Sequence, residues 1–205
     1  MTRTLAARLF FWTWILPTAL TVTSAFASDQ EQNGTAWTLA KLMQDLAQVK
    51  KARATFVEHK HLSMLTKPLL FSGTLEYTAP SRLEKNTLLP KPESLILNQD
   101  KLVVKSGNGE ERRTLSLQEY PALWAFVESI RSTLAGDIGT LERFYHVTLN
   151  GHPEQWQLEL QPSDPKIQSM VSEILIKGSF AEITTIEIRE AGGDYSVMRI
   201  SRDDS

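Results

Sequence analysis

The stretch LLFSGTLEYTAPSRLEKNTLLPKPESLILNQDKLVVKSGNGEERRTL, residues 69–115, decides the fold. Its apolar residues recur at alternate positions over short runs, which is the spacing of strands with one face toward a core. Prolines and polar or glycine-containing turns separate the runs. Short strands joined by tight turns predict one meandering antiparallel sheet. The predicted strands in this stretch are residues 69–77, 82–89, 94–97, 101–106 and 111–115.

Similar patterns continue on both sides of this stretch. Gly73, inside the run 69–77, predicts a bulge or a bend. Apolar steps of three and four predict a helix at 36–51 capped by Thr35, a second from Ser116 to Gly136, and a short one at 138–143. The order helix, sheet, helical insertion, sheet predicts an α+β domain. The remaining predicted strands are residues 54–63, 144–149, 156–160, 172–177, 184–190 and 195–201.

A sheet of this many strands curls, because adjacent strands twist against one another. The curl gives the sheet an apolar inner face, across which the apolar helices lie. A loose fit between sheet and helices encloses a cavity under a movable lid, whereas a tight fit makes an ordinary core, and the pattern leaves both open. The residues expected to line this space are Phe56, Leu75, Tyr77, Leu95, Leu97, Val104, Leu158 and Ile174 on the sheet, and Trp124, Phe126 and Ile130 on the inserted helix.

The first residues have the pattern of a cleavable secretory signal peptide. A basic start precedes an almost wholly apolar run from Leu9 to about Val22, and small residues at Ala25 and Ala27 suit a signal peptidase. A retained membrane anchor is the alternative, but a span takes about 20 apolar residues and Pro17 interrupts this run. We therefore expect a cleaved signal peptide at 1–27, a flexible leader at 28–35, and a single domain outside the cytoplasm at 36–205.

The composition excludes several classes of protein. The chain has no cysteine, so it has neither a disulfide framework nor a lipid-anchoring cysteine. Without Arg3 and Arg8, the 22 basic residues become 20 against 24 acidic residues, which gives a formal charge of −4. The basic clusters are short and balanced by acidic neighbours, unlike the basic stripe of a nucleic-acid binder. We expect a monomer that binds no nucleic acid.

Motifs of catalysis and metal binding give little support for an enzyme. The chain contains no G-x-S-x-G, H-E-x-x-H, P-loop or G-x-G-x-x-G pattern, so we expect no catalytic residue and no cofactor. His59 and His61 share one face of a predicted strand and could hold a metal. Phe56 has the opposite register, however, so two polar side chains on an outer face are the simpler interpretation, and we expect no metal site.

Several segments resemble the LolA family in their order and spacing. The phrases Y-T-A-P-x-R-L-E at 77–84 and V-E-S-I-R-x-T-L-A-G-D at 127–137 are similar to a LolA-related branch of that family. The other segments are 54–58, which resembles the family's F-x-Q strand, 72–77, which resembles its G-x-L strand, 79–84, which resembles its R-P-x-x-F/L turn, and 94–102, which resembles its D-G hairpin.

The resemblance implies a half-open β-barrel closed by helices, which form a lid over an apolar cavity that holds acyl chains in the periplasm. Members of the family carry lipoproteins from an inner-membrane transporter to an outer-membrane receptor. The family pattern has an arginine before the proline of its turn, and that arginine is linked to lid closure. Here Ala79 stands at this position and Arg82 is the nearest arginine, so the cargo and its release stay open.

Three functions follow from these observations. The first is a periplasmic carrier that moves acyl chains of lipoproteins or other lipids between the two membranes, with a transporter and a receptor as transient partners. The second is a signalling or interaction module that senses lipid or holds a membrane regulator. The third, a lipid-modifying enzyme, has no motif in its favour.

Overall fold

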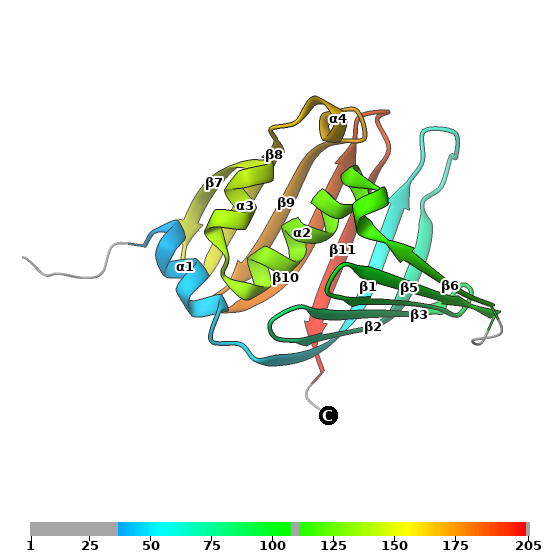
Figure 1. Cartoon of the computed structure of the whole chain (residues 1–205), viewed down its shortest axis with the longest axis horizontal. Coiled ribbons are helices and arrows are strands. Elements are labelled where there is room, and N and C mark those ends of the chain that lie inside the picture. Colours follow the sequence, from blue (N-terminus) through cyan, green and yellow to red (C-terminus); the bar gives the residue numbers. More distant parts are fainter. Residues whose placement is uncertain (1–36, 108–110, 204–205) are drawn as a thin grey trace, which may run out of the picture. The chain divides into compact units, whose positions relative to one another are not determined.

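In the part of the chain that the structure describes, eleven strands form one sheet, in which every neighbouring pair is antiparallel. The computed structural model describes residues 37–107 and 111–203, and residues 36–205 form one unit. The predicted signal peptide and leader lie outside the described residues. The strand order is β6-β5-β4-β3-β2-β1-β11-β10-β9-β8-β7, so the predicted meandering antiparallel sheet is confirmed (Figure 1).

The strands form two meanders that join in the middle of the sheet through the pairing of β1 with β11. The predicted strands all exist, and most extend by one or two residues at an end. The first meander consists of β1 (Lys51–His61), β2 (Leu69–Thr78), β3 (Arg82–Leu89), β4 (Glu93–Asn98), β5 (Lys101–Ser106) and β6 (Glu111–Ser116). The second consists of β7 (Tyr145–His152), β8 (Gln155–Pro162), β9 (Val171–Ser179), β10 (Glu182–Glu190) and β11 (Tyr195–Arg202).

The first helix, α1 (Leu39–Leu46), is shorter than the predicted helix at 36–51. Thr38, rather than Thr35, caps it by accepting a hydrogen bond from the Lys41 N–H at 3.2 Å. The prediction of a helix as far as Lys51 was wrong, because Lys51 already pairs with Thr78 as the first residue of β1. A backbone group that bonds to a neighbouring strand cannot also bond along a helix.

The inserted helix, α2 (Pro121–Ala135), ends where predicted but begins later. Proline has no N–H to lose in a first helical turn, so α2 starts at Pro121 after the short 3₁₀ turn η2 (Leu117–Glu119), and Ser116 still belongs to β6. Gly136 ends α2 with φ 69°, and Asp137 caps the short helix α3 (Ile138–Phe144). A further turn of helix, α4 (Pro165–Gln168), had not been predicted.

The hydrophobic core lies between the helices and the second meander. Leu42 and Met43 of α1, Leu141 of α3 and Leu158 and Ile174 of the sheet are at most 1% exposed. Full burial of a side chain of this size stabilises the fold by about 1.5–3 kcal/mol, so this side of the sheet supplies most of the stability. Within the described part of the chain, no helix has the length and hydropathy that a membrane span requires.

Candidate functional site

All eight sheet residues predicted to line a cavity lie on one face of the sheet, which we call the inner face. Phe56 lies opposite Gly73 of β2 and Ile200 of β11, and the ladder continues through β10 and β9 to Leu158 of β8. Direct partners in antiparallel strands point to the same side. Helices α1, α2 and α3 lie against this face (Figure 1).

The inner face of the second meander is filled. Leu158 and Ile174 are fully buried among side chains of α1, α3 and the neighbouring strands. Trp156, which is 1% exposed, lies over Gly178, and its indole N–H donates to the Phe180 carbonyl at 2.8 Å. Two of the predicted cavity residues therefore lie inside a packed core.

The inner face of the first meander carries a continuous apolar row. Successive partners across β2–β6 form it, and we call them the apolar row: Tyr77, Leu83, Leu97, Leu102 and Leu115. Tyr77 and Leu97 are buried at 5% and 3% exposure, whereas the other three are half-buried. Leu83, Leu102 and Leu115 had not been predicted as site residues, although their alternation with the predicted ones along each strand indicates the same face.

A second row, next to the apolar row, contains a charge. Leu75, Lys85, Leu95 and Val104 lie opposite one another on β2–β5. The Lys85 ammonium lies 2.6 Å from the Glu58 carboxylate of β1 and 4.9 Å from the centre of the Phe56 ring. The strand between them, β2, has Gly73 at this point, which leaves room for the lysine side chain to cross.

Gly73 is also the site of the predicted bulge, which is confirmed. The register between β2 and β3 shifts between Ser72 and Gly73. A Cβ at Gly73 would lie only 1.9 Å from the Asn86 carbonyl oxygen, so only glycine permits this approach of the two strands.

The three predicted residues of α2 contact different neighbours. Phe126 and Ile130 are partly buried against the core. The Trp124 ring meets Phe144 of α3 edge-on, with 5.5 Å between ring centres. Its indole N–H donates to Glu128 at 2.9 Å, and Arg131 pairs with the same carboxylate at 2.6 Å. The partners in these polar interactions therefore all belong to α2.

Tyr77, in the apolar row, lies within reach of a charge on α2. Burial raises the pKa of its phenol, and the positive charge of Arg131 on α2 partly offsets this. Its hydroxyl is buried without a hydrogen-bond partner among the described residues. A buried polar group without a partner is unusual and costs stability, so this position is a candidate contact for a ligand.

The turn that carries Ala79 has no arginine to replace the one in the family pattern. The Ala79 N–H donates to the Lys50 carbonyl at 2.9 Å, and its side chain has no donor. Arg82 lies opposite Thr78 in the register and pairs with Glu84 on the outer face, away from α2. The cation whose charge acts on the Tyr77 phenol is instead Arg131, which belongs to α2.

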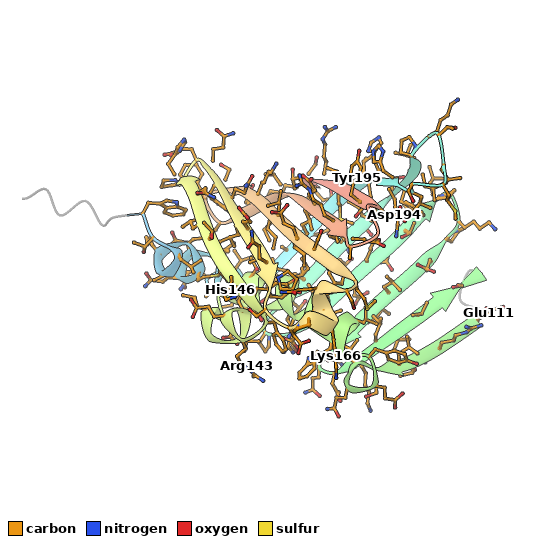
Figure 2. All side chains as sticks on the ribbon, turned by 90° about the horizontal axis from the view of Figure 1, so that it is seen from above. Glu111, Arg143, His146, Lys166, Asp194 and Tyr195 are labelled. Carbon is orange, nitrogen blue, oxygen red and sulfur yellow. The ribbon has the colours of Figure 1, made fainter. Side chains whose placement is uncertain are left out.

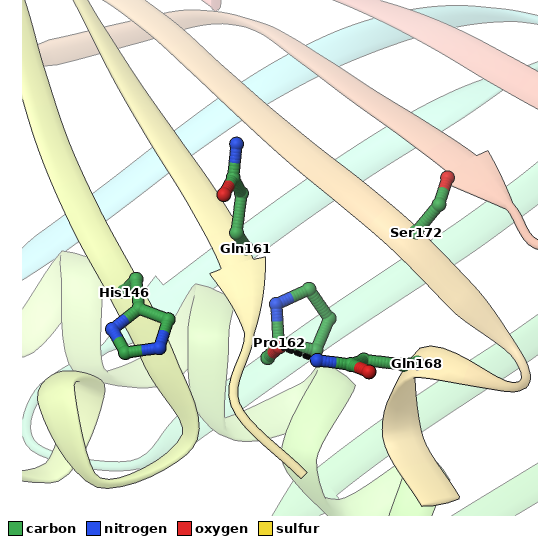
Figure 3. Close-up of a pocket in the computed structure, with 5 residues that line it drawn as sticks. All are labelled: His146, Gln161, Pro162, Gln168 and Ser172. Atoms are coloured by element: carbon green, nitrogen blue, oxygen red, sulfur yellow. Dashed lines mark hydrogen bonds between the residues drawn. The ribbon is translucent and has the colours of Figure 1, made fainter. Parts of the chain in front are cut away.

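The outer face holds the two histidines considered as metal ligands and one shallow depression. The His61 ring stacks on Tyr195 with 4.3 Å between ring centres, and among the described residues no group of three or more potential ligands could hold a metal ion. The depression, of about 330 Å³, is lined by His146, Gln161, Pro162, Gln168 and Ser172 (Figure 3). Its lining includes no carboxylate, and the Ser172 hydroxyl donates to the Arg189 carbonyl at 3.1 Å rather than to a base.

An open antiparallel sheet with helices on an apolar inner face defines this protein as an α+β fold. The chain belongs to the family described as outer membrane lipoprotein carrier protein LolA-like, whose model matches residues 32–201. The resemblance found in the sequence is therefore confirmed. None of the curated proteins matches the chain significantly.

Solved structures with a similar arrangement are distant in sequence. A LolA superfamily protein, NE2245 from Nitrosomonas europaea, is 11% identical over 83% of this chain and 96% of its own, with a TM-score of 0.45. The MucA/MucB complex of Pseudomonas aeruginosa gives 12% identity over 80% of this chain and 56% of that chain, with a TM-score of 0.46. A putative outer membrane lipoprotein-sorting protein domain from Vibrio parahaemolyticus gives 10% identity over 79% and 89%, with a TM-score of 0.39.

Proposed function

We propose that this protein is a periplasmic carrier that holds acyl chains of lipoproteins or other lipids on the inner face of its first meander. One observation carries the proposal: the apolar row crosses five strands without a polar interruption. Most of the row is only half-buried, unlike the filled inner face of the second meander. Membership of the LolA-like family supports the same function.

The length of the row suits an acyl chain. Four strand spacings of about 4.8 Å make the row about 19 Å long. One leaflet of a bilayer provides about 15 Å for the same chain, half of the hydrocarbon thickness. Each methylene removed from water contributes about 0.8 kcal/mol, so a long chain binds without polar recognition. This explains why a sharp sequence motif is unnecessary.

Helix α2 serves as the lid in this proposal. Trp124, Glu128 and Arg131 satisfy one another within the helix, so displacing α2 from the apolar row breaks no hydrogen bond among these three side chains. Apolar contacts have no fixed direction and re-form against an acyl chain. The buried Tyr77 hydroxyl then becomes available to a polar group of the cargo.

Fatty-acid binding with a matched pair of variants tests the proposal. Leu102 on the inner face and Val103 on the outer face are adjacent in β5 and are both half-buried. Leu102→Asp should weaken binding of a fluorescent fatty acid by about tenfold or more, because it places a charge in the row, while Val103→Asp should leave binding almost unchanged. Failure of the wild-type protein to bind, or equal losses in both variants, would contradict the proposal.

The path of the cargo is tested separately. A carrier takes its lipid from an inner-membrane transporter and delivers it to an outer-membrane receptor, so native mass spectrometry of protein isolated from the cell envelope should detect bound lipid. Crosslinking in cells should then capture one partner in each membrane. Protein that is always free of lipid would argue against transport.

An interaction module that holds a membrane regulator is the second candidate. It is favoured by β6, which forms one edge of the sheet. An edge strand offers backbone N–H and C=O groups to an added strand of a partner. Capture of a membrane regulator through β6, in a protein that ignores fatty acids, would favour this function over the carrier.

A further inference from the structure

One end of the sheet exposes an unusual group of large apolar side chains. They lie on the loop between β1 and β2, at the start of β2 and at the end of β3, and we call them the hairpin patch: Met64, Leu65, Leu69, Leu70, Leu88 and Leu89. Their exposures range from 39% for Leu69 to 85% for Met64. Large apolar side chains gathered and exposed in this way mark an interaction surface.

The register places Leu70 and Leu89 together on the outer face, whereas Leu69, opposite Lys60, lies at the inner face. Leu89 lies opposite Ser72 of β2, and Leu70 is two residues from Ser72 on the same face. Leu88 has no partner, because it is the extra residue of the bulge between β2 and β3. On the other side of Ser72 lies Val57 of β1, which is 43% exposed and extends the apolar surface.

The loop that presents the patch is fixed at its base. The Ser63 N–H donates to the Asp194 carboxylate at 2.7 Å, and the His61 ring stacks on Tyr195; Figure 2 labels Asp194 and Tyr195 beside this hairpin. Lys60 at the end of β1 pairs with Glu190 at 3.2 Å. One ion pair and one hydrogen bond to a carboxylate therefore hold the base of the loop, which carries the apolar side chains Met64 and Leu65.

The charge of the exposed segments has one sign. Residues 62–70 and 87–92 contain Lys67 and Lys91 and no acidic residue, although the chain has 24 acidic residues in all. Apolar side chains beside lysines complement the boundary of an anionic lipid bilayer, where the apolar groups enter the acyl region and the ammonium groups meet the lipid phosphates. A hydrophobic protein partner would not require this bias of charge.

We propose that the hairpin patch docks this protein shallowly on the surface of an anionic lipid bilayer. Leu89, Leu70 and Met64 enter the interface, and Lys67 and Lys91 contact the lipid headgroups. This docking is independent of the acyl-binding function, because it uses a different surface. A protein that fails to bind fatty acids would still bind vesicles.

Vesicle sedimentation tests the docking. The purified protein should sediment with vesicles of phosphatidylethanolamine and phosphatidylglycerol and much less with phosphatidylcholine alone, and salt should weaken the binding. The variant Met64→Asp with Leu89→Asp should lose binding by about tenfold or more. Met170→Asp is the matched control, because Met170 is 55% exposed but lies between α4 and β9, outside the patch.

A fluorescent label gives a second measurement that does not depend on a disruptive charge. The chain has no cysteine, so Met64→Cys and Met170→Cys each create one labelling site. An environment-sensitive dye at position 64 should shift to the blue on anionic vesicles, and a dye at position 170 should not. The proposal would be overturned by equal dye responses at the two positions, by equal sedimentation of the Asp variants and wild type, or by no vesicle binding. A dimer in solution that only the patch variant loses would overturn it as well.

Discussion

The ion pair between Glu58 and Lys85 should show strong thermodynamic coupling, because it lies on a face that is otherwise mainly apolar. Removing one member of a fully buried pair costs about 3–5 kcal/mol, whereas replacing both by apolar groups is often nearly neutral. The Glu58 side chain is 11% exposed and that of Lys85 is 27% exposed. The remaining contact with water reduces the cost and makes it unequal for the two residues.

Lys85→Met leaves the more buried charge without a partner, so it should lower the free energy of unfolding by about 2–3 kcal/mol. Glu58→Gln leaves the more exposed ammonium and keeps an oxygen acceptor, so it should cost only about 1–2 kcal/mol. The double variant leaves neither charge unpaired, so it should cost only about 1 kcal/mol. The coupling energy, which is the sum of the two single costs less the cost of the double variant, is then about 2–4 kcal/mol.

Urea unfolding of the four proteins measures these values, with unchanged m-values as the check that each still unfolds in two states. The double variant also makes the second row apolar from Leu75 to Val104, so fatty-acid affinity should hold or rise. Additive costs of the two single substitutions would refute the reasoning, because they would mean that the pair contributes nothing as a pair.

Three further predictions concern the helices and the core. Burial raises the pKa of Tyr145 to about 12 from 10.0. The stability that this neutral phenol contributes below pH 10 should therefore fall by roughly 2–3 kcal/mol as the pH rises to 12. Tyr145→Phe should abolish this fall, as measured by urea unfolding at high pH. The hydrogen bond from the Thr140 N–H lowers the pKa of Asp137. Asp137→Ala should therefore lower the free energy of unfolding by about 1 kcal/mol at neutral pH. This loss should shrink as the pH falls below 3.8, the ordinary pKa of an aspartate, because the wild-type carboxylate is then protonated. In Gly136→Ala, the added Cβ would sit at a positive φ and 2.2 Å from the Met43 carbonyl oxygen. This variant should lower the melting temperature by several degrees. Gly139→Ala is the control and should not, because no atom lies closer than 3.8 Å to its added Cβ.

The strands and turns of this fold are predictable because their signals are local. Alternation fixes which residues of a strand share a face, and Gly136 and Pro80 end the elements that precede them. The limits of α1 were harder to predict, because residues 47–51 continue an apolar helical pattern. The helix ends before Lys51 because Lys51 pairs with Thr78. The local spacing of apolar residues cannot reveal a strand partner 27 positions away.

The candidate site was predictable only in part for the same reason. The eight inner-face positions follow from alternation along single strands. The pairing of β1 with β11, which joins the two meanders, and the reach of Lys85 across Gly73 to Glu58 depend on tertiary contacts. Nor did any periodicity distinguish the filled inner face under α1 from the half-buried one, because both are lined by the same types of residue.

One half of the inner face is filled and the other is half-buried, which would let the proposed carrier stay folded while it exchanges its ligand. A carrier must keep its fold while its binding surface changes partners, and this chain has no disulfide to help it. Leu158 and Ile174 hold the second meander to α1 and α3, so the first meander can be rearranged without loss of the core. Leu158→Ala should therefore cost about 2–5 kcal/mol, and Leu102→Ala, on a half-buried strand near the edge, should cost much less stability while weakening fatty-acid binding. A stability cost at Leu102 equal to that at Leu158 would mean that both halves belong to one rigid core, and the inner face of the first meander could not then open to an acyl chain.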